Sequence, residues 1–235
     1  MTPEKPVAIV TGASRGIGYA IAEVLARRGY RLALVARSQS ALEEAAQRLA
    51  SAGAESRAFA CDVRDAARVS AAFGDILAWT GRVDVLVNNA GVGGFGAVHE
   101  LSEEAWDNTL DTNLRGVFLC SRAVAPQMIR QRSGYIINVG SLAGKNFFAG
   151  AAAYCASKWG LMGLTKCMGE DLRGFGIRVS VICPGSVHTE FSPHAGKDPK
   201  KMLQPEDVAR TVGWLLEQSP TSFASEIELR PTQKP

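Results

Sequence analysis

Tyr154 and Lys158 place a phenol and an ammonium four positions apart in a segment whose pattern predicts a helix. Residues at i and i+4 share one helical face, with Cβ atoms about 5–6 Å apart. A nearby cation favours the phenolate, so the lysine could lower the tyrosine pKa from its ordinary value of about 10 and create an acid/base pair. The same spacing also occurs between solvated residues on helix surfaces. The pair therefore needs support from the rest of the chain.

A glycine-rich segment near the start of the chain could bind a dinucleotide. Residues 11–18 read TGASRGIG and lie between an apolar β-branched run, Val7–Val10, and an amphipathic segment, Tyr19–Arg28. Strand, glycine turn and helix in this order offer free N–H groups and the positive end of a helix dipole to a pyrophosphate. The spacing differs from the usual G-x-G-x-x-G, so the match is one of mechanism. A purely structural turn is the alternative.

Two arginines favour NADP(H) over NAD(H). Arg37 and Ser38 follow the second predicted strand, Arg31–Ala36, at the place where an acidic residue would bind the ribose 2′-OH of NAD. An arginine there suits the 2′-phosphate of NADP instead, and Arg15 in the glycine-rich segment can reach the same region. The alternative is that both arginines are solvated surface residues.

Asp62 and Val63 follow a third predicted strand, Ser56–Cys61. A carboxylate at the carboxyl end of a strand lies where ligands bind in open α/β sheets, so Asp62 could contact the adenine amino group. Equally, it could cap a helix that starts near Arg64. The sequence leaves these two interpretations open.

A turn with the sequence Asn-Asn-Ala-Gly, residues 88–91, follows the fourth predicted strand, Asp84–Val87. Asparagine side chains can bind neighbouring main-chain groups, and glycine permits tight backbone. The turn could form a rigid wall beneath a cofactor.

Asn113 and Ser141 are two further polar residues in informative places. Asn113 lies within a long predicted helix, Glu103–Gln131, where a buried asparagine is unexpected unless its amide has a task or the helix is locally distorted. Ser141 follows the strand Tyr135–Val139, at the carboxyl end of a central strand. The helix that carries Tyr154 is predicted to span Ala151–Arg173.

Strands and helices alternate six times, which predicts a parallel sheet with right-handed crossovers and helices on both faces. No repeat or second domain interrupts the pattern, so we expect one domain over residues 1–235. Residues 189–204 break the pattern with prolines and a glycine, and they could form a lid or a solvated loop. The other predicted elements are the helices Ala41–Ala52, Ala66–Thr80 and Glu206–Gln218 and the strands Arg178–Ile182 and Ser225–Leu229.

The composition argues against several classes of protein. The net charge of +3 comes from 26 basic and 23 acidic residues that are interspersed, so no basic block indicates nucleic acid or membrane binding. No apolar run approaches the roughly 20 residues that span a bilayer, and the start of the chain lacks a signal-peptide pattern, so we expect a cytoplasmic protein. Five cysteines without C-x-x-C and three histidines without metal-ligand spacing predict neither a disulfide framework nor a metal site.

Taken together, these segments resemble the short-chain dehydrogenase/reductase (SDR) family of the compact, single-domain type, and they are similar to its 3-oxoacyl-thioester and carbonyl reductases. The matching blocks run in family order from the glycine-rich segment to Pro184, Gly185 and Thr189, over nearly the whole chain. The resemblance implies an α/β, single-domain Rossmann fold with a seven-stranded, doubly wound parallel sheet. It also implies a catalytic tetrad made of Asn113, Ser141, Tyr154 and Lys158.

The resemblance assigns a role to each tetrad residue. Ser141 and Tyr154 would donate to a carbonyl oxygen while a nicotinamide hydride reaches the carbon, and Tyr154 would act as the acid, or as the base in reverse. Lys158 would hold the nicotinamide ribose, and the main chain of Asn113 would hold a water that returns the proton. Cys155 would only pack. The implied cofactor contacts are Gly12, Ser14, Arg15, Gly16, Ile17, Gly18, Arg37, Ser38, Asp62, Val63, Asn89, Ala90, Gly91, Tyr154, Lys158, Ile182, Pro184, Gly185, Val187 and Thr189.

The chain departs from the 3-oxoacyl-thioester reductases at two places. Their C-terminal Asp-Gly-Gly or Asn-Gly-Gly is replaced by residues 226–231, EIELRP, and Phe175 stands where members that use a carrier protein tend to have arginine. Recognition of an acyl carrier protein is therefore not implied, although Arg132 and the lysines of residues 189–204 could meet an anionic partner.

We therefore expect an NADP(H)-dependent oxidoreductase that transfers a hydride between the nicotinamide and a carbonyl or secondary alcohol, such as a 3-oxoacyl thioester or a small ketone. The alternative is a catalytically silent NADP(H)-binding regulator or scaffold, and the retained Ser141, Tyr154 and Lys158 argue against it. The resemblance also implies a homo-oligomer, tetramer or dimer, built on the helices that contain Asn113 and Tyr154.

Overall fold

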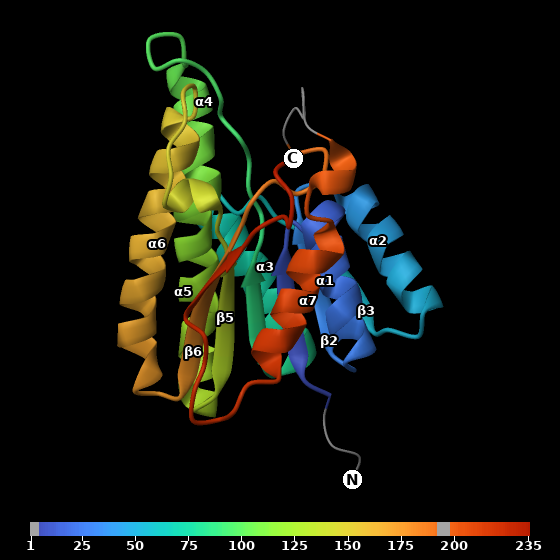
Figure 1. Cartoon of the computed structure of the whole chain (residues 1–235). Helices are drawn as coiled ribbons and strands as arrows, with labels where there is room; N and C mark the ends of the chain where they lie inside the picture. Colours follow the sequence, from blue (N-terminus) through green and yellow to red (C-terminus); the bar gives the residue numbers. More distant parts are fainter. Residues whose placement is uncertain (1–4, 192–197) are drawn as a thin grey trace.

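A seven-stranded parallel sheet forms the centre of the molecule (Figure 1). The computed structural model describes residues 5–191 and 198–235. The strands are β1 (Val7–Thr11), β2 (Arg31–Ala36), β3 (Ser56–Ala60), β4 (Val85–Asn88), β5 (Gly134–Val139), β6 (Ile177–Pro184) and β7 (Glu226–Leu229). Their spatial order is β3-β2-β1-β4-β5-β6-β7, and every neighbouring pair is parallel. The order reverses between β1 and β4, where open α/β sheets bind ligands at the carboxyl ends of the strands.

Helices cover both faces of the sheet, which confirms the predicted doubly wound fold (Figure 1). They are α1 (Gly16–Arg27), α2 (Gln39–Ser51), α3 (Ala66–Thr80), α4 (Glu103–Leu110), α5 (Gly116–Gln131), α6 (Ala152–Arg173) and α7 (Pro205–Leu216). The apolar sides of α1, α2 and α7 pack on one face of the sheet, and those of α3, α5 and α6 pack on the other. Two apolar cores therefore hold the sheet rigid beneath its carboxyl edge.

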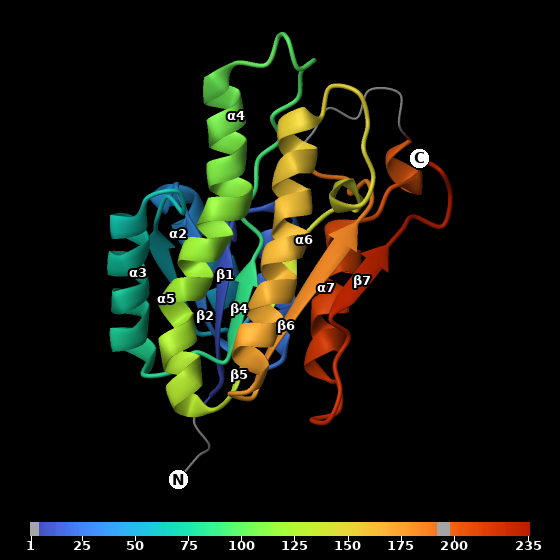
Figure 2. The same cartoon turned by 90° about the vertical axis from the view of Figure 1, so that its left-hand side faces the viewer.

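The long predicted helix 103–131 is not one regular α-helix. A π-helical segment, Asp111–Arg115, separates α4 from α5, although the two helices run on from one another (Figure 2). Asn113 lies in this π-helical segment and is 1% exposed. π-bulges of this kind are rare inside α-helices and are frequent at functional sites.

Helix α1 begins earlier than the sequence predicted. It starts at Gly16 rather than Tyr19, because Arg15 has an extended backbone and serves as the N-cap. Gly16, Ile17 and Gly18 therefore belong to the first helical turn. Strand β6 also extends past its predicted end at Ile182 and includes Pro184.

Buried polar side chains join the sheet to α5 and α6. Asn88 and Asn138 lie side by side on β4 and β5, and Asn88 Nδ2 lies 2.9 Å from Asn138 Oδ1. Asn88 Nδ2 also donates to Ser121 of α5 (3.0 Å), and Asn138 Nδ2 donates to Thr165 of α6 (2.9 Å). Buried networks of this kind fix the relative position of the elements they join. Within the ranges 5–191 and 198–235, no helix is both long enough and apolar enough to cross a membrane.

Candidate active site

The structure brings Ser141, Tyr154 and Lys158 together above the carboxyl edge of the sheet. Tyr154 and Lys158 lie in the first two turns of α6, and Lys158 Nζ is 5.8 Å from the centre of the Tyr154 ring. Strand β5 ends at Val139, and Ser141 comes two residues later. Its side chain caps the short 3₁₀ turn Leu142–Gly144. Its hydroxyl hydrogen-bonds with the Tyr154 phenol.

Lys158 is buried, with an exposed fraction of 6%. Its Nζ donates to the carbonyl oxygen of Val139 at 2.9 Å. A neutral carbonyl compensates little for lost hydration, so burial lowers the lysine pKa to about 8. A lysine in this state can give and take a proton near neutral pH.

The Tyr154 phenol is also buried, and its pKa shifts in the opposite direction to the one expected from the pair alone. Burial raises the pKa, and the hydrogen bond with Ser141 only partly opposes that rise. The Lys158 ammonium donates to the Val139 carbonyl oxygen and lies 5.8 Å from the centre of the Tyr154 ring. A raised pKa keeps the phenol protonated at neutral pH, which suits a proton donor.

The side chain of Asn113 fastens the loop after β4 to α6. Asn113 Oδ1 accepts from Val92 N (2.8 Å), and its Nδ2 donates to Val92 O (2.8 Å) and to Ser157 Oγ (3.0 Å). The amide thus has a task, and the helix around it is distorted. The two explanations considered for a buried asparagine both hold. Because its side chain is engaged, only the main chain of Asn113 remains for a bound water.

Hydrogen bonds between side chains and main chain lock the glycine-rich segment to the turn after β4. The Thr11 hydroxyl accepts from the N–H groups of Asn89 and Ala90, both at 3.0 Å. Asn89 Nδ2 donates to the carbonyl oxygens of Thr11 (3.0 Å) and Gly12 (3.3 Å). The turn 88–91 therefore does form a rigid wall beside the glycine-rich segment, at the point where the strand order reverses.

The start of α1 fits a pyrophosphate group. A Cβ on Gly18 would lie 2.1 Å from the Gly12 carbonyl oxygen, so only glycine allows this close approach. Side chains cap the amino ends of α2, α3 and α4, whereas no side chain caps α1. The first-turn N–H groups of α1 are thus left for an anion. Ser14 is half-buried in the same turn.

Arg37 and Asp62 lie at the ends of the adjacent strands β2 and β3, in which Ala36 pairs with Ala60. Arg37 is exposed, and its charge is near enough to help lower the Asp62 pKa. The main cause of that lowering is Arg64, whose main chain and guanidinium both donate to Asp62. These residues surround the region expected for the adenosine ribose.

Ser38 and Asp65, near this region, cap helices, and the sequence did not predict these caps. The Ser38 hydroxyl accepts from Ala41 N at 3.3 Å and caps α2. The interpretation of Asp62 as a helix cap is wrong, because α3 begins at Ala66 and Asp65 caps it. Val63 is buried.

The chain after β6 returns to the glycine-rich segment. Gly185 N donates to Leu229 O of β7 at 2.8 Å, and Val187 forms a bridge with Leu203. The Thr189 methyl group lies 3.6 Å from the place where a Cβ of Gly16 would be. Ile182, Pro184, Gly185, Val187 and Thr189 thus run along one side of the site. Part of the expected lid, residues 192–197, lies outside the described residues.

Two phenylalanines, Phe95 and Phe191, pack against the Tyr154 ring, and a third, Phe148, packs against Phe95. Ring centres of Phe95 and Phe191 are 5.4 Å and 5.8 Å from that of Tyr154. Phe148 is 6.4 Å from Phe95. Their signal in the sequence is that they occur in loops at strand ends rather than in strands or helices. In the described ranges, no cluster of three or more His, Cys, Asp or Glu side chains could hold a metal.

Comparisons with known proteins give one consistent result. The family model described as short chain dehydrogenase matches residues 6–200. A 3-oxoacyl-acyl-carrier-protein reductase (FabG) of Staphylococcus aureus is 38% identical over 219 residues, 88% of this chain and 89% of that protein.

Two solved structures resemble the whole chain. A metagenomic short-chain oxidoreductase in complex with NADP is 43% identical, with a TM-score of 0.87 over 97% of this chain and 98% of that one. An alcohol dehydrogenase from Thermococcus sibiricus, complexed with 5-hydroxy-NADP, is 35% identical, with a TM-score of 0.91 over 99% of both chains.

Proposed function

The chain belongs to the short-chain dehydrogenase family and is an NADP(H)-dependent oxidoreductase, and we propose that it interconverts a free small-molecule carbonyl compound and its secondary alcohol through Ser141, Tyr154, Lys158 and Asn113. The observation that carries the proposal is the state of Tyr154. Its phenol is buried, keeps its proton through a raised pKa, hydrogen-bonds with Ser141 and lies beside a lysine whose pKa is about 8.

The residues divide the work of reduction between them. NADPH, when bound, supplies the hydride that reaches the carbonyl carbon. Ser141 and Tyr154 donate hydrogen bonds to the carbonyl oxygen as negative charge grows there. Tyr154 then gives its proton to that oxygen, and Lys158 returns a proton to the tyrosine. The Asn113 main chain would hold the water that connects Lys158 to solvent. In the reverse direction, Tyr154 takes the proton from the alcohol.

The cofactor would extend along the carboxyl edge of the sheet. The pyrophosphate would bind the turn from Gly12 through Ser14, Gly16 and Ile17 to Gly18, and the 2′-phosphate would meet Arg37, Arg15 and Ser38. Asp62 and Val63 would contact the adenine, and Asn89, Ala90 and Gly91 would line the ribose. Lys158 and Tyr154 would hold the nicotinamide ribose, and Pro184, Gly185, Val187 and Thr189 would flank the nicotinamide ring.

The alternative, a silent NADP(H)-binding regulator, has less support. A scaffold would gain nothing from a buried lysine without a carboxylate partner, because such a charge destabilises the fold. NADPH oxidation with a panel of small ketones and 3-oxoacyl thioesters tests the proposal. We expect turnover of at least one ketone, with NADPH preferred over NADH. Tight NADPH binding without turnover of any carbonyl or alcohol would instead support the regulator.

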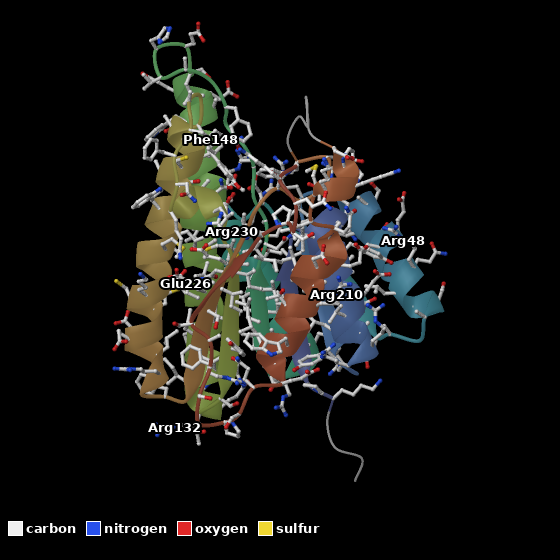
Figure 3. All side chains as sticks on the ribbon, viewed as in Figure 1. Arg48, Arg132, Phe148, Arg210, Glu226 and Arg230 are labelled. Carbon is white, nitrogen blue, oxygen red and sulfur yellow. The ribbon has the colours of Figure 1, made fainter. Side chains whose placement is uncertain are left out.

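The position of Arg132 bears on the substrate. Arg132 ends α5 beside the amino end of β5, at the opposite end of the molecule from Phe148 (Figure 3). A carrier protein bound at Tyr154 of the same chain would therefore gain no contact from Arg132.

We also propose a cytoplasmic homotetramer made of one 235-residue domain per chain. An apolar groove of about 490 Å³ lies between α6 and the stretch from the end of α4 to the start of α5, lined by Leu110, Asp111, Leu114, Arg115, Phe118, Gly160 and Leu164. Phe118 in this groove is exposed, as is Trp159, the residue before Gly160 in α6, and exposed large apolar side chains are typical of an interface between copies. Light scattering in solution would distinguish tetramer, dimer and monomer.

A further inference from the structure

Three phenylalanine rings from three separate loops converge on the catalytic tyrosine. Phe95 lies between β4 and α4, Phe148 between β5 and α6, and Phe191 after β6. Phe95 and Phe191 both contact the Tyr154 ring, and Phe148 extends the group through Phe95. Figure 3 shows Phe148 beside the ends of α4 and α6, above the sheet. We call Phe95, Phe148 and Phe191 the aromatic wall.

The backbone holds the ring of Phe95 in place. A Cβ on Gly93 would lie 2.4 Å from the Phe95 ring, so the ring packs directly on glycine backbone. A Cβ on Gly94 would lie 2.3 Å from Thr109 Oγ1, which shows how closely this loop packs on α4. Gly96 N then donates to Gly150 O at 2.8 Å, and this bond ties the Phe95 loop to the Phe148 loop. The loops of Phe95 and Phe148 are therefore held together before any substrate binds.

The rings of the wall are only partly covered. Phe95, Phe148 and Phe191 are 41%, 53% and 43% exposed, while the tyrosine they approach is 9% exposed. Apolar rings that are fixed and half-exposed next to a catalytic hydroxyl offer their remaining surface to whatever reaches that hydroxyl. Aromatic rings pair favourably at centre-to-centre distances of about 4.5–7 Å in tilted or offset arrangements. A ring on the substrate would extend the set of ring contacts that the wall already makes.

Resting on the proposed function, we propose that the aromatic wall is the specificity pocket and that the substrate class is aryl ketones and the corresponding secondary alcohols. The aryl group on the carbonyl carbon packs against Phe95, Phe148 and Phe191, which places the carbonyl oxygen at Tyr154 and Ser141. In the reduction, the C=O π bond breaks, the hydride of NADPH bonds to carbon and the Tyr154 proton bonds to oxygen. NADPH leaves as NADP⁺.

Steady-state kinetics of the holoenzyme with NADPH test this assignment. The substrates are acetophenone, cyclohexyl methyl ketone, which matches its bulk without aromaticity, and 2-butanone. We expect acetophenone to exceed 2-butanone in kcat/KM by at least about tenfold, with cyclohexyl methyl ketone between them. Equal kcat/KM values for acetophenone and 2-butanone, with clear turnover of both, would overturn the aryl assignment and leave the proposed function intact.

Substitutions then locate the preference. Phe95→Leu, Phe148→Leu and Phe191→Leu keep apolar bulk but remove the ring. Each should lower kcat/KM for acetophenone by about 3- to 10-fold and that for 2-butanone by less than about twofold. Phe147→Leu is the matched control, because Phe147 is the neighbour of Phe148 but is 88% exposed. An equal loss in the Phe147 variant, or equal losses with both ketones, would contradict the wall as the source of specificity.

A binding measurement separates this proposal from the proposed function. Calorimetry of acetophenone with NADPH-loaded Tyr154→Phe protein measures the pocket without turnover. We expect binding that weakens about 3- to 10-fold when Phe95→Leu is added and does not change with Phe147→Leu. If no ketone is turned over by the wild type but this pattern holds, the proposed function fails and the pocket stands. If Phe95→Leu does not change the affinity for acetophenone, the assignment of the aromatic wall as the specificity pocket is wrong.

Discussion

The nucleotide side and the substrate side of the site lie along one edge of the same sheet, but they are built in different ways. On the nucleotide side, the backbone of the glycine-rich segment meets the backbone and amide of Asn89, and Gly18 leaves no room for a Cβ. On the substrate side, side-chain rings from three loops meet around Tyr154. In the proposed site, the backbone contacts would fix where the cofactor lies, whereas the ring contacts, which can change with one substitution, would select the substrate.

Two lysines near the Ser141 turn differ in the partners of their ammonium groups and in the direction of their pKa shifts. Lys145 pairs with Glu226 and Glu228 of β7, and these carboxylates raise its pKa. Figure 3 labels Glu226, at the start of β7, and Arg230, directly after its end. Lys158, in contrast, has a carbonyl as its partner and a lowered pKa. Lys145 stabilises a contact with β7, whereas the lowered pKa of Lys158 suits the proton transfer that we propose for it.

Replacing the buried lysine should have the largest effect. We expect Lys158→Met to lower kcat by about 10²- to 10⁴-fold, the usual contribution of a group in acid–base catalysis. Lys145→Met, which removes a surface ion pair, should stay within a few-fold of the wild type. Comparable losses in the two variants would remove the distinction between the lysines. Steady-state NADPH oxidation measures both.

The same variant tests the lysine pKa through stability. Between the native pKa of about 8 and the ordinary value of 10.5, the unfolded lysine binds a proton that the native lysine does not. The free energy of unfolding contributed by this group therefore rises with pH across that window. Urea denaturation should show the difference between wild type and Lys158→Met growing in favour of the wild type from pH 8 toward pH 10. A difference independent of pH would contradict the lowered pKa.

Gly18→Ala should disrupt the nucleotide side alone. The new Cβ would meet the Gly12 carbonyl at 2.1 Å and Asn89 Nδ2 at 2.6 Å, so the turn must shift. We expect NADPH affinity to fall by about 100-fold and the free energy of unfolding to fall by about 1–3 kcal/mol. Gly74→Ala is the control, since Gly74 lies in α3 with no atom within 4 Å of the added Cβ. That change should raise stability by up to about 1 kcal/mol and leave NADPH affinity unaltered.

Arg37→Asp tests whether Arg37 binds the 2′-phosphate of NADPH, and we expect an effect of intermediate size. Loss of a charge-assisted hydrogen bond is worth about 1.5–3 kcal/mol, so the preference for NADPH over NADH should fall by about 10- to 100-fold. Fluorescence titration of both cofactors measures the ratio. Unchanged relative affinities would exclude Arg37 from the phosphate site.

Glu190→Gln should have the smallest effect. Glu190 forms an ion pair with Arg15, and both side chains are more than 75% exposed, at 77% and 76%. If Arg15 binds the 2′-phosphate, Glu190 competes with that phosphate, and its removal should tighten NADPH binding by less than about fivefold. The gain should vanish at high salt. Weaker binding in this variant would show that the pair supports the cofactor site.

Much of the nucleotide side could be predicted from sequence because it depends on local patterns. Strand, glycine turn and helix follow one another within residues 7–27, and the order of elements then fixes the sheet. The exact start of α1 could not be read, because Gly16 and Gly18 belong to a helical turn although glycine usually marks a loop.

Long-range contacts explain what the sequence did not reveal. The π-helical segment depends on Asn113 bonding to Val92 and Ser157, 21 and 44 positions away. The raised pKa of Tyr154 depends on burial by loops that come from distant parts of the chain. The aromatic wall likewise forms only when three loops meet, and its members look like ordinary loop residues in the sequence.

The most direct test of the account is a comparison of NADPH binding and NADPH oxidation in Tyr154→Phe and wild-type protein. The variant keeps the ring contacts with Phe95 and Phe191 and loses only the hydroxyl. We predict that NADPH affinity stays within about twofold, while ketone-dependent NADPH oxidation falls by about 10²- to 10⁴-fold. Equal oxidation rates in the two proteins would contradict the assignment of Tyr154 as the proton donor.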